Sequence, residues 1–172
     1  MKLSMYLMLS IVPGLLVLSG IGMPLHAQAP AESLPLQEGL GGHHYPISTD
    51  VAMAQRYFDQ GLILSYGFNH AEAARSFREA QTLDPTCAMC YWGEALVLGP
   101  NINAPMEPSV VPQAYGAVEK ALALRGQATE KEGALIQAVA KRYSKEALND
   151  RSPLDVAYAE AMRGVAKQFP DD

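Results

Sequence analysis

The chain has 172 residues, of which 49% are hydrophobic and 18% are charged, and its formal net charge at pH 7 is -5. A chain of this length suits one domain. The mildly acidic charge is scattered, so it gives no electrostatic basis for binding nucleic acid or an anionic membrane surface. Because Ala and Leu are abundant and β-branched runs are few, the composition favours an all-helical fold.

Residues 1–29 have the layout of a secretory signal peptide. Lys2 supplies a positive charge, residues 7–21 are mostly apolar, and cleavage is expected after Ala27 or after Ala29. An uncleaved membrane anchor is the alternative, but the apolar run is shorter than the roughly 20 residues that span a bilayer. We therefore expect a periplasmic or secreted protein with no stable membrane insertion after removal of the signal.

Residues 30–49 are expected to form a linker and an extended segment, because glycine and proline recur there and oppose helix. The hydroxyls of Ser48 and Thr49 are suited to capping the first helix. Apolar residues at helical spacing carry that helix to about Phe68.

The second and third helices are expected to follow with short connections. Asn69 and, three residues later, Glu72 have the spacing of a capping box for a helix over residues 71–83. Residues 84–86, Asp-Pro-Thr, are typical of a turn and a new cap. The third helix is expected over residues 87–98.

A proline-rich loop over residues 99–108 is expected to separate the third helix from the fourth, which is marked by Ala114, Val118 and Ala121. Insertions of this kind often lie on a binding face. The candidates for the rim of a pocket are therefore Asn101, Asn103 and Met106. Alternatively, the prolines serve only to stiffen an exposed turn.

Two further helices complete the chain. Thr129 and Glu132 are expected to cap a fifth helix that runs to about Leu148. A start signal at Ser152 opens a sixth helix that ends near Phe169. No polar capping helix follows, which helical solenoids normally need. Either the chain is a fragment of a longer protein, or its last face is covered by a partner or by self-association with a second copy.

Small, aromatic and apolar residues recur at the spacings of a tetratricopeptide repeat, at Tyr57, Gly61, Leu64, Ala73, Phe77, Ala80 and Pro85. The small residues let two helix backbones approach, Phe77 fills the space between them, and Pro85 stops the second helix. A shift of 34 residues finds the same aromatic, small and large order at Tyr91, Ala95 and Leu98.

On these residues the chain resembles the tetratricopeptide-repeat family over about residues 50–125. Within that family it is similar to exported bacterial proteins with a Cys-Ala-Met-Cys-Tyr-Trp-Gly helix and a Leu-Gly-Pro-Asn-Ile-Asn loop. The resemblance implies an all-α fold of tandem antiparallel helix hairpins that form a short right-handed solenoid. Residues 50–172 are expected to form this domain, with about three hairpins.

The resemblance also implies a concave groove lined by the first helix of each repeat. Its inward positions are Phe58, Leu62, Tyr66, Met89, Trp92 and Leu96. So apolar a stripe predicts a binding surface for a hydrophobic peptide, with Trp92 and Tyr66 as anchors. The alternative is that the third hairpin or residues 43–47 cover the stripe.

Cys87 and Cys90, the only cysteines, stand in a C-x-x-C spacing at the start of a helix. In an oxidising compartment they are candidates for a structural disulfide, or else an idle pair. A redox-active pair is the alternative, because a helix N-terminus stabilises a thiolate. Against it, redox sites of this spacing follow a strand in an α/β fold, and no strand is expected here. Covalent haem is disfavoured because Tyr91 replaces the axial histidine.

His43, His44 and His70 supply further metal-ligand types, but their spacing with the cysteines matches no metal site. We therefore expect neither a metal nor another cofactor. No nucleophile–base pair and no glycine-rich phosphate loop is visible. Glu94 is an acid on the same helix as Trp92, and such an acid more often pairs with an arginine or faces solvent than acts in catalysis.

The sequence thus favours a non-catalytic scaffold or adaptor in the cell envelope that binds a protein or peptide. On this hypothesis, replacing Trp92 with Ala abolishes partner capture while the fold survives. The alternative is a periplasmic redox or metal-handling protein that uses Cys87 and Cys90.

Overall fold

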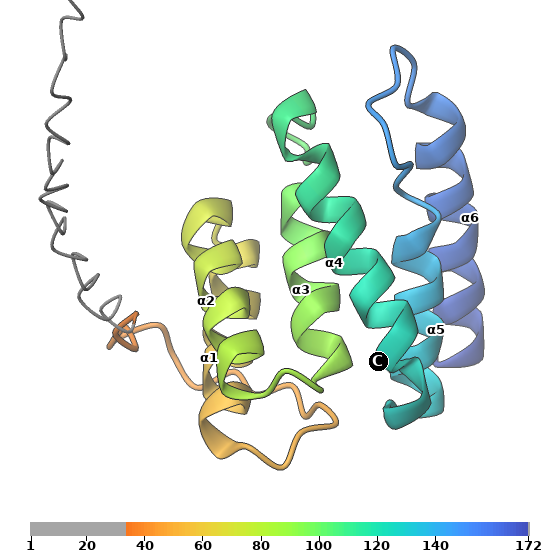
Figure 1. Cartoon of the computed structure of the whole chain (residues 1–172). Helices are drawn as coiled ribbons and strands as arrows, with labels where there is room; N and C mark the ends of the chain where they lie inside the picture. Colours follow the sequence, from red (N-terminus) through yellow and green to blue (C-terminus); the bar gives the residue numbers. More distant parts are fainter. Residues whose placement is uncertain (1–33, 172) are drawn as a thin grey trace, which may run out of the picture. The chain divides into compact units, whose positions relative to one another are not determined.

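The computed structural model describes residues 34–171, so the expected signal peptide lies outside the described part of the chain. Within this part the protein is all-helical, with six α-helices packed in sequential pairs (Figure 1). The helices are α1 (Ala52–Tyr66), α2 (His70–Leu83), α3 (Ala88–Leu98), α4 (Val111–Leu124), α5 (Glu130–Ala140) and α6 (Ser152–Gln168). Two short 3₁₀ segments, η1 (Pro108–Val110) and η2 (Arg125–Gln127), flank α4. None of the helices between residues 34 and 171 has the length and apolar character needed to cross a bilayer.

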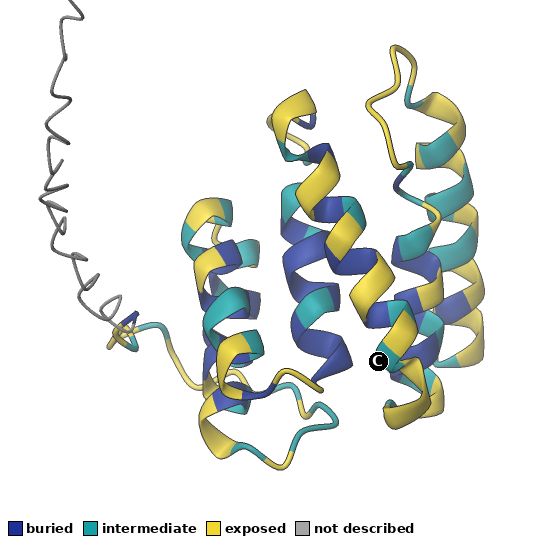
Figure 2. Cartoon of the chain, viewed as in Figure 1, coloured by how far each residue is buried: buried dark blue, intermediate teal, exposed yellow. Residues whose placement is uncertain are grey.

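Each helix packs against the next, and α3 also contacts both α1 and α5. Helix α3 is therefore surrounded on most sides, and eight of its 11 residues are buried. Figure 2 shows this contrast with α2 and α4, whose outer faces are exposed. The central position explains why residues 88–98 carry only one charged side chain.

The buried ring of Phe77, on α2, lies where α1 and α3 approach it. It packs edge-on against Phe58, with ring centroids 5.5 Å apart. A Cβ atom at Gly61 would come within 2.8 Å of the Phe77 ring, and one at Gly93 would come closer still. The expected role of Gly61 and Phe77 is confirmed, and Gly93 is a second glycine that the same ring requires.

The start of α1 differs from the sequence-based expectation. The helix begins after Val51, and no side chain caps it. Ser48 instead donates hydrogen bonds from its backbone N (2.7 Å) and its Oγ (2.5 Å) to Glu132 on α5. Thr49 Oγ1 donates to Asp84 Oδ2 (2.5 Å). Buried carboxylates require donors, and these two hydroxyls meet that need rather than capping α1.

The cap expected at α2 is also wrong, whereas the cap at α5 is confirmed. Asn69 precedes α2, but its side chain makes no capping hydrogen bond, and Glu72 accepts one from Arg75 (3.1 Å). At α5 the Thr129–Glu132 capping box is complete. Glu132 Oε2 accepts from Thr129 N at 2.7 Å, so one carboxylate both caps α5 and holds the segment before α1.

Replacing Glu132 with Gln is expected to reduce stability at neutral pH by about 1–3 kcal/mol, the effect of disrupting a buried hydrogen-bonded group. Burial raises the pKa of the Glu132 carboxyl, but hydrogen bonds from Ser48 and Thr129 outweigh burial, so the pKa lies below its ordinary value. A carboxyl with a depressed folded-state pKa stabilises the fold above its unfolded-state pKa. That stabilisation is lost as the pH falls through the folded-state pKa.

Urea unfolding at neutral pH and at several pH values below 4.5, the ordinary pKa of this carboxyl, measures the effect. The difference in unfolding free energy between wild type and Glu132→Gln should shrink as the pH falls. Glu119→Gln, which changes an exposed carboxyl on α4, is the control. A difference that stayed constant across this pH range would contradict the assigned pKa direction.

Helix α5 ends at Ala140 rather than near Leu148 as expected. The residues after Ala140 leave the helix and form hydrogen bonds with the last turn of α3. Arg142 Nη1 donates to Leu96 O (3.0 Å). Tyr143 Oη donates to another carbonyl of the same turn. Burial raises the pKa of Tyr143 to about 12, so this donor stays protonated well above neutral pH. The last carbonyls of a helix need hydrogen-bond donors from outside the helix. Pro100, in the loop after α3, has no backbone N–H to donate.

Glu94 is buried at the junction of α2, α3 and α4. Its carboxylate accepts hydrogen bonds from Gln81 Nε2 (2.8 Å) and Gln113 Nε2 (2.7 Å). Arg78 Nη1 donates a third, at 3.3 Å, from α2. Of the two structural roles considered for this acid, pairing with an arginine is the one present, and facing solvent is not. All three donors join helices, so Glu94 has a structural role.

Candidate functional site

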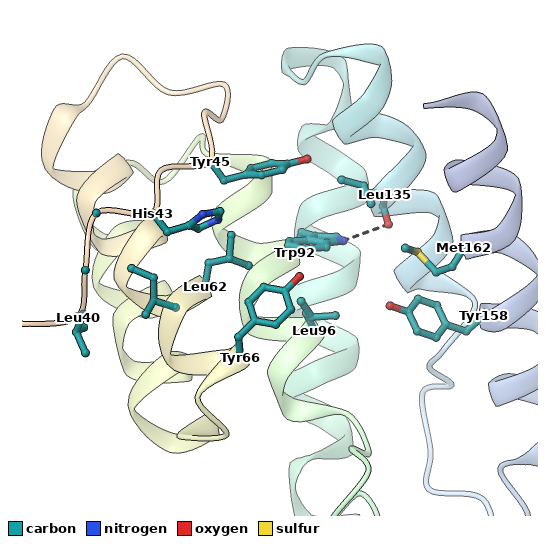
Figure 3. A pocket seen from close by; sticks show the side chains of 13 residues that line it. Leu40, His43, Tyr45, Leu62, Tyr66, Trp92, Leu96, Leu135, Tyr158 and Met162 are labelled. Atoms are coloured by element: carbon teal, nitrogen blue, oxygen red, sulfur yellow. Dashed lines mark hydrogen bonds between the residues drawn. The ribbon is translucent and has the colours of Figure 1, made fainter. Parts of the chain in front are cut away.

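A pocket of about 720 Å³ opens between α1, α3, α5, α6 and residues 40–45 (Figure 3). Its lining is mainly aliphatic and aromatic, and we call it the aromatic pocket. The side chains that define it are Tyr45, Leu62, Tyr66, Trp92, Tyr158 and Met162. Binding pockets for organic molecules typically measure about 300–1,000 Å³, so this one is large enough for a discrete ligand group.

Four of the six residues expected to line a groove lie in this pocket: Leu62, Tyr66, Trp92 and Leu96. The other two expectations are wrong. Phe58 is 0% exposed and Met89 is 1% exposed, and neither lines the pocket. Phe58 lies one helical turn before Leu62, where the rings of Phe77 and Trp92 already pack against it. Phe58 and Met89 therefore belong to the hydrophobic core and not to the pocket wall.

Trp92 forms one wall of the pocket while being only 8% exposed. Its Nε1 donates a hydrogen bond to Leu135 O on α5, at 3.2 Å. Because the indole N–H is already paired, Trp92 offers a ligand its ring face rather than a donor. The same bond fixes α5 against α3. Trp92 is the only tryptophan of the chain, so its fluorescence reports on the pocket.

Two walls of the pocket come from segments that the groove hypothesis treated as covers. Residues 40–45 run along α1, where Tyr45 N donates to Asp59 Oδ1 (3.1 Å) and Gln55 Nε2 donates to Tyr45 O (2.9 Å). His44 Nδ1 lies 2.8 Å from Asp59 Oδ2. The third helix pair supplies the facing wall through α5 and α6. The apolar stripe is therefore enclosed on two sides.

Tyr158 and Met162 were missed by reasoning from the sequence. They stand four residues apart on α6 and so share one helical face, but many apolar pairs do the same in any amphipathic helix. Burial raises the pKa of the Tyr158 phenol; the nearby Arg142 guanidinium opposes this shift and the Tyr66 phenol adds to it.

Two cations lie against aromatic rings of the pocket wall. Lys131 Nζ is 4.6 Å from the centroid of the Tyr45 ring, and Arg142 Cζ is 4.9 Å from that of Tyr158. Among the described residues that line the pocket, none carries a carboxylate. Each cation therefore makes a cation–π contact with a ring of the pocket wall.

Of the alternatives left open for Cys87 and Cys90, the disulfide is the one present, and both residues are 0% exposed. Cys87 Sγ also accepts a hydrogen bond from Cys90 N, at 3.1 Å, at the start of α3. Exchange with another thiol requires direct attack on a sulfur atom. Complete burial blocks that attack in the folded protein, which favours a structural role over a redox role.

The Cys87→Ala/Cys90→Ala double variant is expected to lose about 2 kcal/mol of unfolding free energy, the chain-entropy contribution of so short a loop. Urea unfolding of the oxidised wild type, the reduced wild type and the double variant would measure it. Native protein should also resist a thiol reductant that rapidly reduces the urea-unfolded chain. Equally rapid reduction of the folded and unfolded protein would instead revive the redox alternative.

The remaining candidate ligands are dispersed. His44 pairs with Asp59, His43 lines the aromatic pocket, and His70 lies against Phe68 at the start of α2. No group of three His, Cys, Asp or Glu side chains within residues 34–171 is arranged to hold a metal ion.

The loop after α3 does not rim the pocket. Its backbone closes on itself through paired hydrogen bonds between Asn101 and Ala104. Met106 is buried in the core, where its sulfur accepts a hydrogen bond from Arg151 Nη1 at 3.4 Å. The alternative role, a stiff turn, fits this geometry.

Comparison with known proteins finds no matching family model, no matching curated protein and no matching solved structure.

Proposed function

We propose that the protein is a non-catalytic helical-repeat scaffold, similar to tetratricopeptide-repeat proteins, that binds a protein or peptide partner in the cell envelope. The observation that carries the proposal is the aromatic pocket, a partly enclosed space of about 720 Å³ with apolar walls. The location in the envelope rests on the signal-peptide pattern of residues 1–29.

The chemistry of the lining supports binding of an apolar side chain. An aromatic side chain buries about 150–250 Å², and at about 25 cal/mol per Å² this corresponds to about 4–6 kcal/mol before the costs of association. Apart from residues 40–45, the walls belong to packed helices, and the hydrogen bond from Trp92 to Leu135 holds two of these helices together. Little ordering of the pocket is therefore required when a ligand enters.

The partial enclosure refines the groove hypothesis. An open groove accepts an extended chain along its whole length, whereas residues 40–45 and α6 bound this pocket on two sides. Such a shape suits one or two side chains from a partner better than a long continuous segment. We therefore expect recognition of a short motif.

The test uses the fluorescence of Trp92 during titration with acetyl-Gly-Phe-Gly-amide and with acetyl-Gly-Ser-Gly-amide, two neutral peptides. The phenylalanine peptide should produce a saturable change and the serine peptide none. Tyr66→Ala should weaken binding by about 1 kcal/mol or more, because aromatic anchors dominate such contacts. Tyr66 is 77% exposed, so this variant should fold normally.

Phe68→Ala is the matched control, because Phe68 is also an exposed aromatic near the end of α1 but does not line the pocket. It should bind the phenylalanine peptide like the wild type. If neither peptide altered Trp92 emission, or if both aromatic variants lost binding equally, the pocket would not be the site.

A further inference from the structure

Residues 38–43 lie between two anchored points of the segment before α1, and we call them the flap. Before the flap, Gln37 N donates to Gln60 Oε1 (2.7 Å). After it, Tyr45 N donates to Asp59 Oδ1 (3.1 Å). No residue of the flap forms a hydrogen bond with another residue of the described chain. Hydrogen bonds therefore hold this segment at its two ends alone.

The backbone of the flap is rich in glycine. Gly39 and Gly41 have φ angles of +79° and +89°, a region that glycine enters without steric cost, and Gly42 follows directly. A Cβ atom added at any of the three would meet no described atom within 4 Å beyond its chain neighbours. Packing around the glycines thus does not fix the backbone, and they are suited to act as hinges.

One apolar side chain holds the flap against the helices. Leu40, which stands between Gly39 and Gly41, is half-buried and packs against the hydrophobic core, whereas the other five flap residues are exposed. Leu40 also lines the aromatic pocket, on the side opposite Tyr158 (Figure 3). Partial burial of a single leucine is a weak attachment compared with the packing of a helix.

The flap has space on both sides. Residues 40–43 line the aromatic pocket and also a second hollow of about 270 Å³. The two hollows lie over different faces of α1, because Leu62 and Tyr66 line the first, whereas Arg56 and Gln60 line the second. The flap can therefore move from one hollow toward the other without displacing a helix.

We infer that the flap is a gate, closed over the aromatic pocket while Leu40 is docked on the core, and opened toward the second hollow by rotation at its glycines. This inference rests on the proposed function, since the gate governs how a partner's side chain enters and leaves that pocket. The facing walls belong to packed helices, so the flap is the wall that moves at the lowest cost in free energy.

The first test removes the attachment of the flap. Stopped-flow fluorescence of Trp92 with acetyl-Gly-Phe-Gly-amide measures the association and dissociation rate constants. Leu40→Ala should raise the association rate constant about threefold or more, because loss of the apolar contact increases the open fraction. If the flap were a fixed wall, this variant would dissociate faster but associate at an unchanged rate, which would overturn the inference.

Leu36→Ala is the matched control for this variant. Leu36 is also a half-buried leucine of the segment before α1, but it precedes the flap and does not line the aromatic pocket. Its replacement should leave both rate constants unchanged. An equal rise in association for the two variants would show that general loosening of the segment is the cause, contrary to the inference.

The second test stiffens the flap. Gly42 lies outside the left-handed region, so Gly42→Ala adds a methyl group without backbone strain. Both rate constants should fall about twofold or more through reduced backbone freedom, with the dissociation constant nearly unchanged. Gly126→Ala, on η2 and also without an atom within 4 Å of the added Cβ, is the control. Unchanged rates, or a weaker dissociation constant from a methyl group that obstructs the pocket, would contradict the gate.

Acrylamide quenching of Trp92 tests the flap without the peptide. The indole is 8% exposed and lines the pocket, so the quencher reaches it more often when the flap is open. Leu40→Ala should raise the quenching rate constant and Gly42→Ala should lower it. If the peptide failed to bind but quenching followed this order, the proposed function would fail and the moving flap would stand. If the peptide bound but neither rates nor quenching responded, the gate alone would fail.

Discussion

Replacement of Trp92 with Ala should lower the free energy of unfolding by about 3–5 kcal/mol, the usual effect of removing a large buried aromatic side chain. The indole is 8% exposed and packs against Phe58, with ring centroids 6.5 Å apart. Its N–H also bonds to Leu135 O across to α5. The variant therefore loses apolar contacts and a hydrogen bond that joins two helices.

Urea unfolding followed by circular dichroism measures this loss without relying on the removed fluorophore. Trp92→Phe is the control, because it retains much of the apolar volume and should lose markedly less stability. A loss below about 1 kcal/mol for Trp92→Ala, typical of surface substitutions, would show that the side chain is not part of the core. The sequence-based hypothesis expected the fold to survive Trp92→Ala, whereas the burial of Trp92 predicts a large loss of stability. Tyr66→Ala is therefore the variant for testing binding.

Substitution of Gly93 by Ala should destabilise the protein by about 1–3 kcal/mol, although Ala is the better helix former by about 1 kcal/mol. The added methyl group would overlap the ring of Phe77, which is 0% exposed and is held on its other side by Gly61. Because the ring is completely buried and lies against both glycines, we expect the helices to separate rather than the ring to move aside.

Gly164→Ala is the matched control, because Gly164 is also in a helix but has no atom within 4 Å of an added Cβ. It should raise stability by about 0.5–1 kcal/mol. Thermal unfolding of both variants gives effects of opposite sign if the contact with Phe77 is the cause. Adding Phe77→Leu to Gly93→Ala should then produce less than the sum of the two single losses.

Local patterns predicted the helices well. The spacing of Gly61, Phe77 and Pro85 gave the first helix pair, because small residues and a stop signal act within one hairpin. The capping box of Thr129 and Glu132 was equally local and is present. The end of α5 was not predictable in this way, since Arg142 leaves the helix to bond with the last turn of α3.

The candidate site was only partly predictable. Trp92 and Tyr66 were predicted because the tetratricopeptide-like spacing puts both on the inner face of the expected repeats. Tyr158 and the residues that hold the segment before α1 were not found, because their positions depend on packing between elements far apart in sequence. No sequence pattern predicts the hydrogen bond between Ser48 and Glu132, which are 84 residues apart in the chain.

That separation has a consequence for the order of assembly. The segment before α1 emerges early in synthesis, yet the acceptor that fixes Ser48 is made only when α5 appears. Contacts between distant positions must await closure of the intervening chain, which slows their formation. The anchor at Ser48 and the pocket wall from α5 and α6 therefore form late, whereas Tyr45 bonds to α1, the next element of the chain. A nascent or refolding chain thus acquires its first helices before it acquires a complete pocket.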